Sequence, residues 1–232
     1  PSDDDLTFCS IGENCLPQGI LDRRKLPNVV SPLSWARSNI DYAIGFFEEN
    51  FDTLLSEDHL AHEERYGHQM VVNRHFPAEP GLFERSVSAG FEFTHHDVLR
   101  DPGHRQSYRR KIDRMKTLIE GNRGRVVFLY HHRMTAHPDK SPVIARLQRF
   151  LDLCAARGSG RFLALMMSQR LVSSPGERGV EMTQSGAVTH CLFRTLRPWA
   201  GNVHDELWAK VDDDLLDQMF SRFQDRLEAG PV

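Results

Sequence analysis

Cys15 is the side chain of this sequence that is best placed to act as a nucleophile. It follows the apolar run Leu6 to Ile11 and precedes Pro17, a residue that is well tolerated in the first turn of a helix. A thiol at a helix N-terminus meets partial positive charge, which lowers its pKa and favours the thiolate. Backbone N–H groups in such a turn can also hold an oxyanion. The sequence therefore predicts thiol chemistry at Cys15.

The residues around Cys15 are candidates for binding a substrate. Gly12 permits a sharp turn after the strand, while Glu13 and Asn14 can orient groups or donate to an oxyanion. Trp35 lies between a proline-containing loop and a helix cap. It is either a packing anchor or one wall of a pocket beside Cys15.

A cysteine nucleophile also needs a base, which is usually a histidine oriented by a third polar group. Three segments offer one: His95 to Asp97, His131 and His132, and Asn202 to Asp205. Neighbouring histidines on a strand point to opposite faces, so only one of His95 and His96 can face the site. The candidate bases are His96, His132 and His204, with Asp97 and Asn202 as further polar residues of the site.

The position of each histidine has a different rationale. His132 ends a predicted strand, and ligands of open α/β sheets bind at the carboxyl ends of the strands. His204 precedes the last predicted helix, by analogy with α/β hydrolytic folds. The sequence alone leaves open which of the three is the partner of Cys15.

Metal and phosphate motifs are not indicated. The residues His59, His62 and Glu63 lack the spacing of the zinc-protease helix motif, and the segment His95 to Asp97 would need a ligand from elsewhere. No phosphate-binding glycine motif is present. We therefore expect no metal and no required cofactor, with coenzyme A as a possible ligand.

The elements expected around Cys15 alternate between strand and helix. Arg125 to Tyr130 and Phe162 to Met167 are apolar throughout, as in strands whose two faces are both covered. A helix that starts at Ser141 and Pro142 connects them. The sequence predicts a three-layer α/β domain with a mostly parallel central sheet, Rossmann-like or esterase-like, over residues 1–232.

Other segments are less regular. Residues 57–99 are expected to form an irregular insert, with 57–67 as a surface helix or loop, Met70 to Val72 as a short strand, and 90–97 as a strand or ordered loop. A capping box at Ser38 to Asp41 predicts a helix that continues to Leu54. Further helices are expected from His104 to Gly121 and from Leu207 to Phe223.

The totals of the chain exclude several classes of protein. The net charge of −3 over 232 residues gives no reason to expect nucleic acid or an acidic membrane as a partner. No apolar run approaches the ~20 residues of a membrane span, and no signal peptide is visible. The four cysteines have no metal or redox spacing and indicate a reducing, cytoplasmic compartment. Because the chain does not begin with Met, we expect it to be part of a longer protein.

The segment Ser10 to Cys15 resembles the opening motif of an uncharacterised bacterial family that carries the description of a papain-like cysteine peptidase. Pro32 to Trp35 is similar to that family's Pro-x-x-Trp segment, and Phe93 to Asp97 resembles its Phe-x-His-Asp segment. The resemblance covers the chain to about residue 130. It implies a thiol nucleophile at Cys15 and a histidine partner such as His96.

The sequence also has a weaker resemblance to two groups of enzymes. One group acts in capsule-polysaccharide metabolism and binds coenzyme A, and the other comprises esterases whose first motif is Gly-Asp-Ser. Gly12 to Asn14 would take the place of that motif, and the likeness implies acyl groups on sugars as substrates. The leading hypothesis is a thiol-dependent acyl-transfer enzyme that acts on a small-molecule, carbohydrate or peptide substrate. The alternatives are a polysaccharide-metabolism transferase domain that binds a sugar nucleotide or coenzyme A without covalent catalysis, and a non-catalytic binding module. The sequence does not give the oligomeric state.

Overall fold

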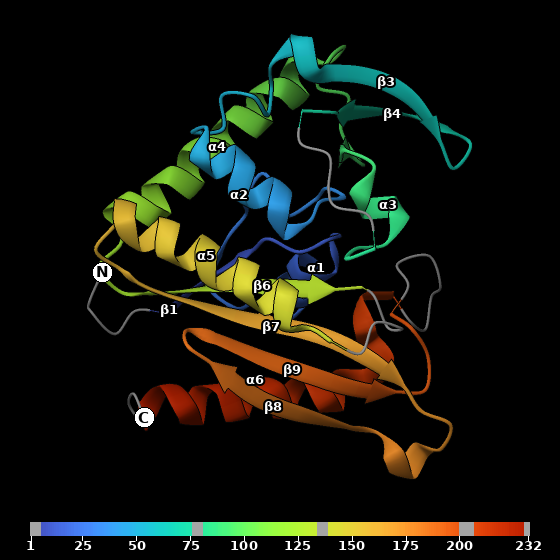
Figure 1. Cartoon of the computed structure of the whole chain (residues 1–232), viewed down its shortest axis with the longest axis vertical. Helices are drawn as coiled ribbons and strands as arrows, with labels where there is room; N and C mark the ends of the chain where they lie inside the picture. The colour runs from blue at the N-terminus through green and yellow to red at the C-terminus, as the bar shows by residue number, and fades with distance from the viewer. Residues whose placement is uncertain (1–5, 76–80, 134–138, 200–206, 230–232) are drawn as a thin grey trace.

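A computed structural model describes residues 6–75, 81–133, 139–199 and 207–229 of the chain. Its centre is a six-stranded sheet, with all neighbouring strands parallel except β8, which pairs antiparallel with β9. Figure 1 shows this sheet crossing the molecule between two layers of helices. In spatial order the strands are β2 (Asn28–Val29), β1 (Leu6–Ser10), β6 (Arg125–His132), β7 (Arg161–Leu171), β9 (Val188–Thr195) and β8 (Gly179–Ser185).

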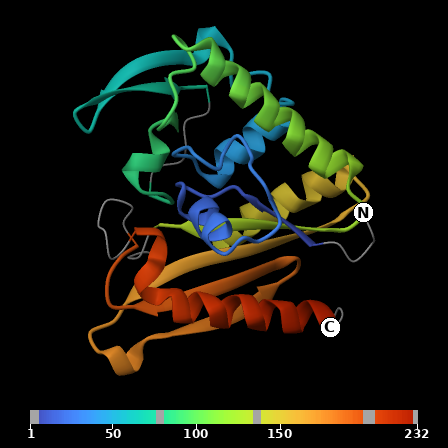
Figure 2. The same ribbon diagram turned by 180° about the vertical axis from the view of Figure 1, so that it is seen from behind.

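Helices cover both faces of this sheet, which confirms the predicted three-layer α/β domain. One core lies between the sheet and α2 (Ile40–Glu48), α4 (Pro102–Gly121) and α5 (Ser141–Arg157). The other lies between the sheet and α1 (Leu16–Arg23) and α6 (Asp213–Glu228). Figure 2, from behind, shows α1 and α6 in front of the strands. Alternate side chains of β6 enter the two cores, because successive residues of a strand point to opposite faces.

The described residues of the insert, 57–75 and 81–99, form regular elements, which corrects the expectation of an irregular segment. Residues 57–67 form a short 3₁₀ turn, Glu57–His59, followed by β3 (Leu60–Arg65). Tyr66 and Gly67, both with positive φ, make a two-residue hairpin turn into β4 (His68–Asn73). Helix α3 (Arg85–Ser88) and β5 (Phe91–Phe93) follow, and β3, β4 and β5 form a second, antiparallel sheet.

Two expected helix boundaries also shift. Helix α2 ends at Glu48, not Leu54, because Asn50 and Phe51 adopt left-handed backbone conformations. Its cap is Asn39, whose side chain accepts the Tyr42 N–H, in place of a capping box from Ser38.

The last helix is shorter than expected at its start. A 3₁₀ segment, Leu207–Asp212, occupies the predicted first turns, and α6 begins at Asp213. A further 3₁₀ turn, Pro175–Glu177, joins β7 to β8. No helix in the described ranges is long and apolar enough to cross a bilayer.

The order of the strands reverses between β1 and β6. From β1 the chain passes through α1 to β2 on one side, and after the insert and α4 it returns to β6 on the other side of β1. In open α/β sheets, ligands bind at such a switch point, outside the carboxyl ends of the strands. The turn after β1 and the end of β6 therefore frame the expected site.

Candidate active site

Glu13 is the centre of the polar contacts at the switch point. Its side chain is fully buried, and its Oε1 accepts hydrogen bonds from Tyr130 Oη and His132 Nδ1, each at 2.7 Å. Its Oε2 accepts the Arg133 backbone N–H at 2.9 Å. Its backbone carbonyl accepts the Ser38 N–H at 3.3 Å. A buried carboxylate needs such partners, and here they tie the turn after β1 to the end of β6.

Tyr130 is a permanent donor in this arrangement. Burial, and then the adjacent Glu13 charge, raises the pKa of Tyr130 well above its usual value. The phenol therefore keeps its proton and donates to the carboxylate. This bond helps to fix the carboxylate that in turn holds the His132 ring.

Cys15 is the N-cap residue of α1 and is partly exposed at the carboxyl edge of the sheet. Burial raises the pKa of its thiol, against the opposing effects of its own backbone N–H and of the Arg37 and Arg133 charges. The expected lowering of the thiol pKa by the helix end is therefore wrong: desolvation exceeds the favourable terms. The thiol is protonated at neutral pH and needs a base to become a nucleophile.

The residues that flank Cys15 have local structural roles. Asn14 Oδ1 accepts the Leu16 N–H at 3.2 Å, and Pro17 has no N–H. The first turn of α1 therefore offers fewer backbone donors to an oxyanion than the sequence suggested. Gly12 is buried, and a Cβ there would lie 2.6 Å from Pro17 Cγ and 3.2 Å from the His131 backbone nitrogen, so this turn requires glycine.

The structure separates the histidines that the sequence offered. His132 is 1% exposed and faces the buried Glu13 carboxylate. His131 points to the opposite face, 5.5 Å from the Trp199 ring, and neither of its ring nitrogens has a hydrogen-bond partner among the described residues. Burial lowers the pKa of His131 to about 3, so this ring is neutral.

The two neighbouring histidines of the insert, His95 and His96, also have different surroundings. The ring of His96 packs on His104 and Tyr108 of α4, with centroids 4.9 and 5.3 Å away. Burial and the Lys111 charge lower its pKa to about 4. His95, not His96, lies beside Trp35, at 6.2 Å between ring centroids.

Asp97 has a structural role in the same segment. Its carboxylate accepts the N–H groups of Leu99 and Arg100 and contacts His62 Nε2 at 3.0 Å. Partial burial raises the pKa of Asp97, but these hydrogen bonds outweigh that effect and lower it. The hydrogen bond with His62 contributes most to the lowering. The predicted residues Asn202 and His204 lie outside the described residues.

A second polar pair lies further along the same edge. Ser168 Oγ of β7 and His190 Nε2, near the start of β9, are 2.8 Å apart. Burial, with the charges of Lys140 and His132, lowers the pKa of His190 to about 4. Ser168 faces His132 in the pairing of β6 and β7, so this pair extends the polar edge that begins at Glu13.

The remaining cysteines are inert by comparison. Burial raises the pKa of Cys9 and Cys191 to about 12 and that of Cys154 further, and all three are enclosed in the cores. In the described ranges, no three His, Cys, Asp or Glu side chains are grouped so that they could hold a metal ion.

Two residues of the site, Arg37 and Arg133, were missed by the sequence analysis. Neither belongs to a motif, and an isolated arginine carries no signal of its own. Position could have found Arg133, because it directly follows the strand that ends in His132. Arg37 could be found only from tertiary structure.

A cavity lies at the other edge of the sheet, where the strands begin. It measures about 1040 Å³ and is lined mostly by apolar side chains, among them Phe8, Leu26 and Leu118. No cysteine or histidine lines it. The side chains that could do chemistry therefore select the carboxyl edge, and not this cavity, as the candidate site.

Comparison with known proteins gives one description for this chain. The sequence model of a protein family described as "Putative papain-like cysteine peptidase" matches residues 6–168. No curated protein and no solved structure matches the chain. The matched region runs from β1 to Ser168 in β7 and contains Glu13, Cys15 and His132.

Proposed function

The chain belongs to the family described as "Putative papain-like cysteine peptidase", and from this premise we propose that it is a hydrolase in which Cys15 attacks an acyl carbon. His132 is the base and Glu13 orients it. The family description supports a cysteine-dependent hydrolase in general. The assignment of the residues is our own.

The contact between Glu13 and His132 is the observation that carries this proposal. A base next to a nucleophile is usually oriented by a third polar group, and a carboxylate on one ring nitrogen fixes the tautomer of a histidine. The 2.7 Å contact places Nδ1 on the carboxylate, which leaves Nε2 to exchange protons. Glu13 is two residues from Cys15, so orienting group and nucleophile share one turn.

The reaction would proceed in two halves. His132 Nε2 takes the proton from Cys15 Sγ, the sulfur bonds to the acyl carbon, and the carbonyl oxygen takes the electron pair. When the intermediate collapses, the bond to the leaving group breaks and that group takes the proton from His132. Water then attacks the thioester and gives a proton to His132, which returns it to the departing thiol while the acid is released.

The raised pKa of Cys15 supports this order of events. A protonated thiol reacts only when its proton is removed during the attack, so the base is required at that step. Among the described residues, no histidine is hydrogen-bonded to the Cys15 thiol. We therefore propose that the contact closes when substrate binds, since catalytic hydrogen bonds are often long in free enzymes.

The test uses p-nitrophenyl acetate, a small activated ester, with intact-protein mass spectrometry. We expect a rapid burst of nitrophenolate and one acetyl group on Cys15, followed by slow turnover. Cys15→Ser should lose the burst, while Cys154→Ser, which changes a thiol enclosed in the core, should keep it. Acetylation that persists in Cys15→Ser, or a burst that is unaffected by His132→Gln, would contradict the proposal.

Coenzyme A and sugar acceptors enter the same assay as probes of transfer. We propose water as the acyl acceptor. Acetyl-coenzyme A replaces the ester as donor, and a mixture of simple sugars is added as acceptor. Acetylated sugar in place of acetate would assign the chain to the transferases and would keep the role of Cys15.

A further inference from the structure

Two guanidinium groups act electrostatically on the Cys15 thiol, and they come from segments far apart in the sequence. Arg37 precedes α2, and its neighbour Ser38 donates its N–H to the Glu13 carbonyl. Arg133 follows β6 and donates its own N–H to the Glu13 carboxylate. Both charges lower the pKa of the Cys15 thiol, in opposition to burial. The segments that carry the two cations are thus hydrogen-bonded to the turn that carries the thiol.

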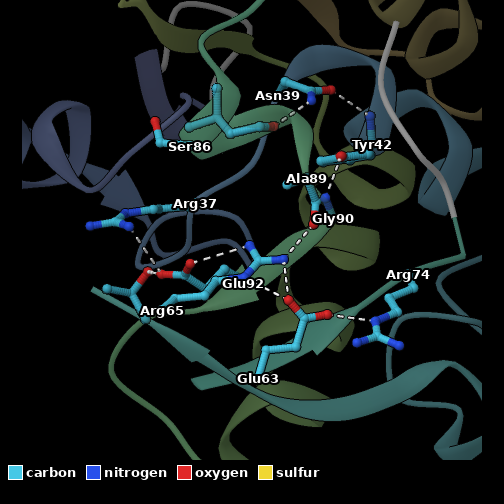
Figure 3. Close-up of polar contacts among 12 residues, drawn as sticks. Arg37, Asn39, Tyr42, Glu63, Arg65, Arg74, Ser86, Ala89, Gly90 and Glu92 are labelled. Carbon is cyan, nitrogen blue, oxygen red and sulfur yellow. Dashed lines mark hydrogen bonds and ion pairs between the residues drawn. The ribbon is translucent and has the colours of Figure 1, made fainter. Parts of the chain in front are cut away.

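Arg37 is held in place by the insert (Figure 3). Its backbone exchanges two hydrogen bonds with Glu92 of β5, at 3.0 and 2.9 Å. The Glu92 side chain is fully buried, with Oε1 3.6 Å from Arg37 Nη1 and Oε2 3.5 Å from Arg65 Nη1. The Arg37 guanidinium also lies 4.2 Å from the centre of the Tyr66 ring.

The Glu92 carboxylate is fixed in turn by strand β3. Arg65 donates to Glu63 at 2.9 and 2.7 Å and to the Ala89 carbonyl, and Glu63 also contacts Arg74. Figure 3 shows these side chains as one connected row from Arg74 to Arg37. The second sheet therefore acts as a support for the guanidinium beside the thiol.

Arg133 is anchored by the same insert. Its Nη2 lies 3.3 Å from Glu84 Oε2, and its Nη1 lies 3.4 Å from Ser86 Oγ, both just before or within α3. Both arginines of the site are thus positioned by acidic residues between residues 57 and 99. The insert that the sequence left without a role connects to the site through these two side chains.

Arg37 keeps a donor without an acceptor. Its Nη1 is buried and has no hydrogen-bond partner among the described residues, since Glu92 is beyond hydrogen-bond distance. Buried donors are rarely left unpaired in folded proteins, because the loss of hydration is not compensated. A guanidinium presents several N–H groups in a planar fork that matches a carboxylate.

We propose that the substrate carries a carboxylate close to the acyl carbon that Cys15 attacks, and that Arg37 and Arg133 bind this carboxylate. This inference rests on the proposed function, because it names the substrate class of that site. The insert supplies the selectivity by holding both guanidinium groups. A neutral substrate of the same shape binds less well, because it brings no negative charge to the two guanidinium groups.

The test compares two alkylating agents that differ in one group. Iodoacetate and iodoacetamide both transfer a carbon to the Cys15 sulfur with loss of iodide, but only iodoacetate carries a carboxylate. Their rate constants at Cys15 are read by peptide mass mapping. The reference is the same cysteine in the urea-unfolded chain. We expect the ratio of iodoacetate to iodoacetamide rates to be about tenfold higher in the folded chain and to fall with added salt.

Variants of the two arginines test whether Arg37 and Arg133 cause the preference for iodoacetate. Arg37→Gln and Arg133→Gln should each lower the ratio severalfold, whereas Arg149→Gln, which removes an ion-paired arginine on α5, should not. Arg37→Lys, which keeps the positive charge, should retain most of the selectivity. Thermal unfolding of each variant shows whether it is folded, and Arg133→Gln tests the site even if Arg37→Gln does not fold.

The two proposals fail in different ways. A folded-chain ratio equal to that of the unfolded chain, or a ratio unchanged by both glutamine variants, would overturn the carboxylate site. If the parent chain gives no burst with p-nitrophenyl acetate but keeps its alkylation selectivity, the hydrolase is contradicted and the anion site stands. The ratio of the two alkylation rates does not depend on His132, because both reagents attack the same thiolate. His132→Gln should therefore lower the burst and keep the ratio.

Discussion

The two faces of β6 end in neighbouring histidines that meet opposite surroundings. On the face of α2, α4 and α5, His132 contacts the Glu13 carboxylate, which Tyr130 also holds. On the face of α1 and α6, His131 lies among apolar groups near Trp199, with no hydrogen bond among the described residues. Both rings are 1% exposed, so burial does not distinguish them.

The difference comes from a partner that another strand supplies. Ser10 of β1 lies opposite Leu129 of β6, so the chain that leaves β1 passes beside the last residues of β6. The turn directs Glu13 to the face that carries Tyr130 and His132. On the opposite face, no acid among the described residues is hydrogen-bonded to His131. A histidine at a strand end thus gains a chemical role only where the neighbouring turn provides an acceptor.

The largest expected effect is on hydrolysis by the two histidine variants. His132→Gln should lower kcat for p-nitrophenyl acetate by about 10²- to 10⁴-fold, which is the usual contribution of a general base. His131→Gln, one residue away on the same strand, should leave kcat nearly unchanged. Stopped-flow measurement of the burst compares the two. Equal losses in both variants would abolish the distinction between the faces.

Glu13→Gln tests the orienting group. The amide has the volume of the carboxylate but brings N–H donors to a place where Tyr130, His132 and Arg133 already donate. We expect a smaller loss of kcat than in His132→Gln, and a fall of about 1–3 kcal/mol in the free energy of unfolding from the unpaired groups. Urea denaturation measures the second effect. A variant with the stability and activity of the parent chain would show that the contact is incidental.

The pH dependence of stability tests the surroundings of His131, on the face of α1 and α6. The pKa of His131 is about 3 in the folded chain, well below the ordinary value of about 6.5, because burial disfavours its charge. Between these values the unfolded chain binds a proton that the folded chain does not, so stability falls as the pH falls. At pH 5 this one group costs about 2 kcal/mol relative to pH 7.5.

His131→Leu removes the acid-sensitive contribution of this ring. The free energy of unfolding of the variant should therefore fall less between pH 7.5 and pH 5 than that of the parent chain. Urea denaturation at both values measures the difference. His96 and His190, with pKa values of about 4, retain their own acid-sensitive terms, so the variant is not fully pH-independent. An unchanged pH dependence in His131→Leu would mean that this ring is charged in the folded chain.

The smallest expected effect concerns two buried tyrosines. Tyr130→Phe removes one hydrogen bond to Glu13 and should cost about 0.5–1.5 kcal/mol, together with a modest loss of kcat. Tyr108 is buried as fully, yet its hydroxyl has no partner among the described residues, so Tyr108→Phe should be neutral or stabilising. Thermal unfolding of both variants checks the order. The reverse order would place the important polar contacts outside the Glu13 turn.

Much of the fold could be predicted from the sequence because it depends on local patterns. The unbroken apolar runs that became β6 and β7 give strands covered on both faces, and Gly12 and Pro17 place Cys15 between a strand and a helix. The hairpin of β3 and β4 escaped prediction because β3 is polar, and its turn is signalled only by Gly67. The cytoplasmic location and the absence of a required cofactor stay predictions.

The sequence by itself determined where the thiol lies, the class of fold and the set of histidines that could act as a base. Only the tertiary structure decided which histidine meets a carboxylate, because that depends on the register between β1 and β6. It also reversed the expected shift of the Cys15 pKa, since desolvation depends on what packs around a side chain. Arg37 reached the site through its pairing with Glu92, a contact between residues that are distant in sequence and carry no shared pattern.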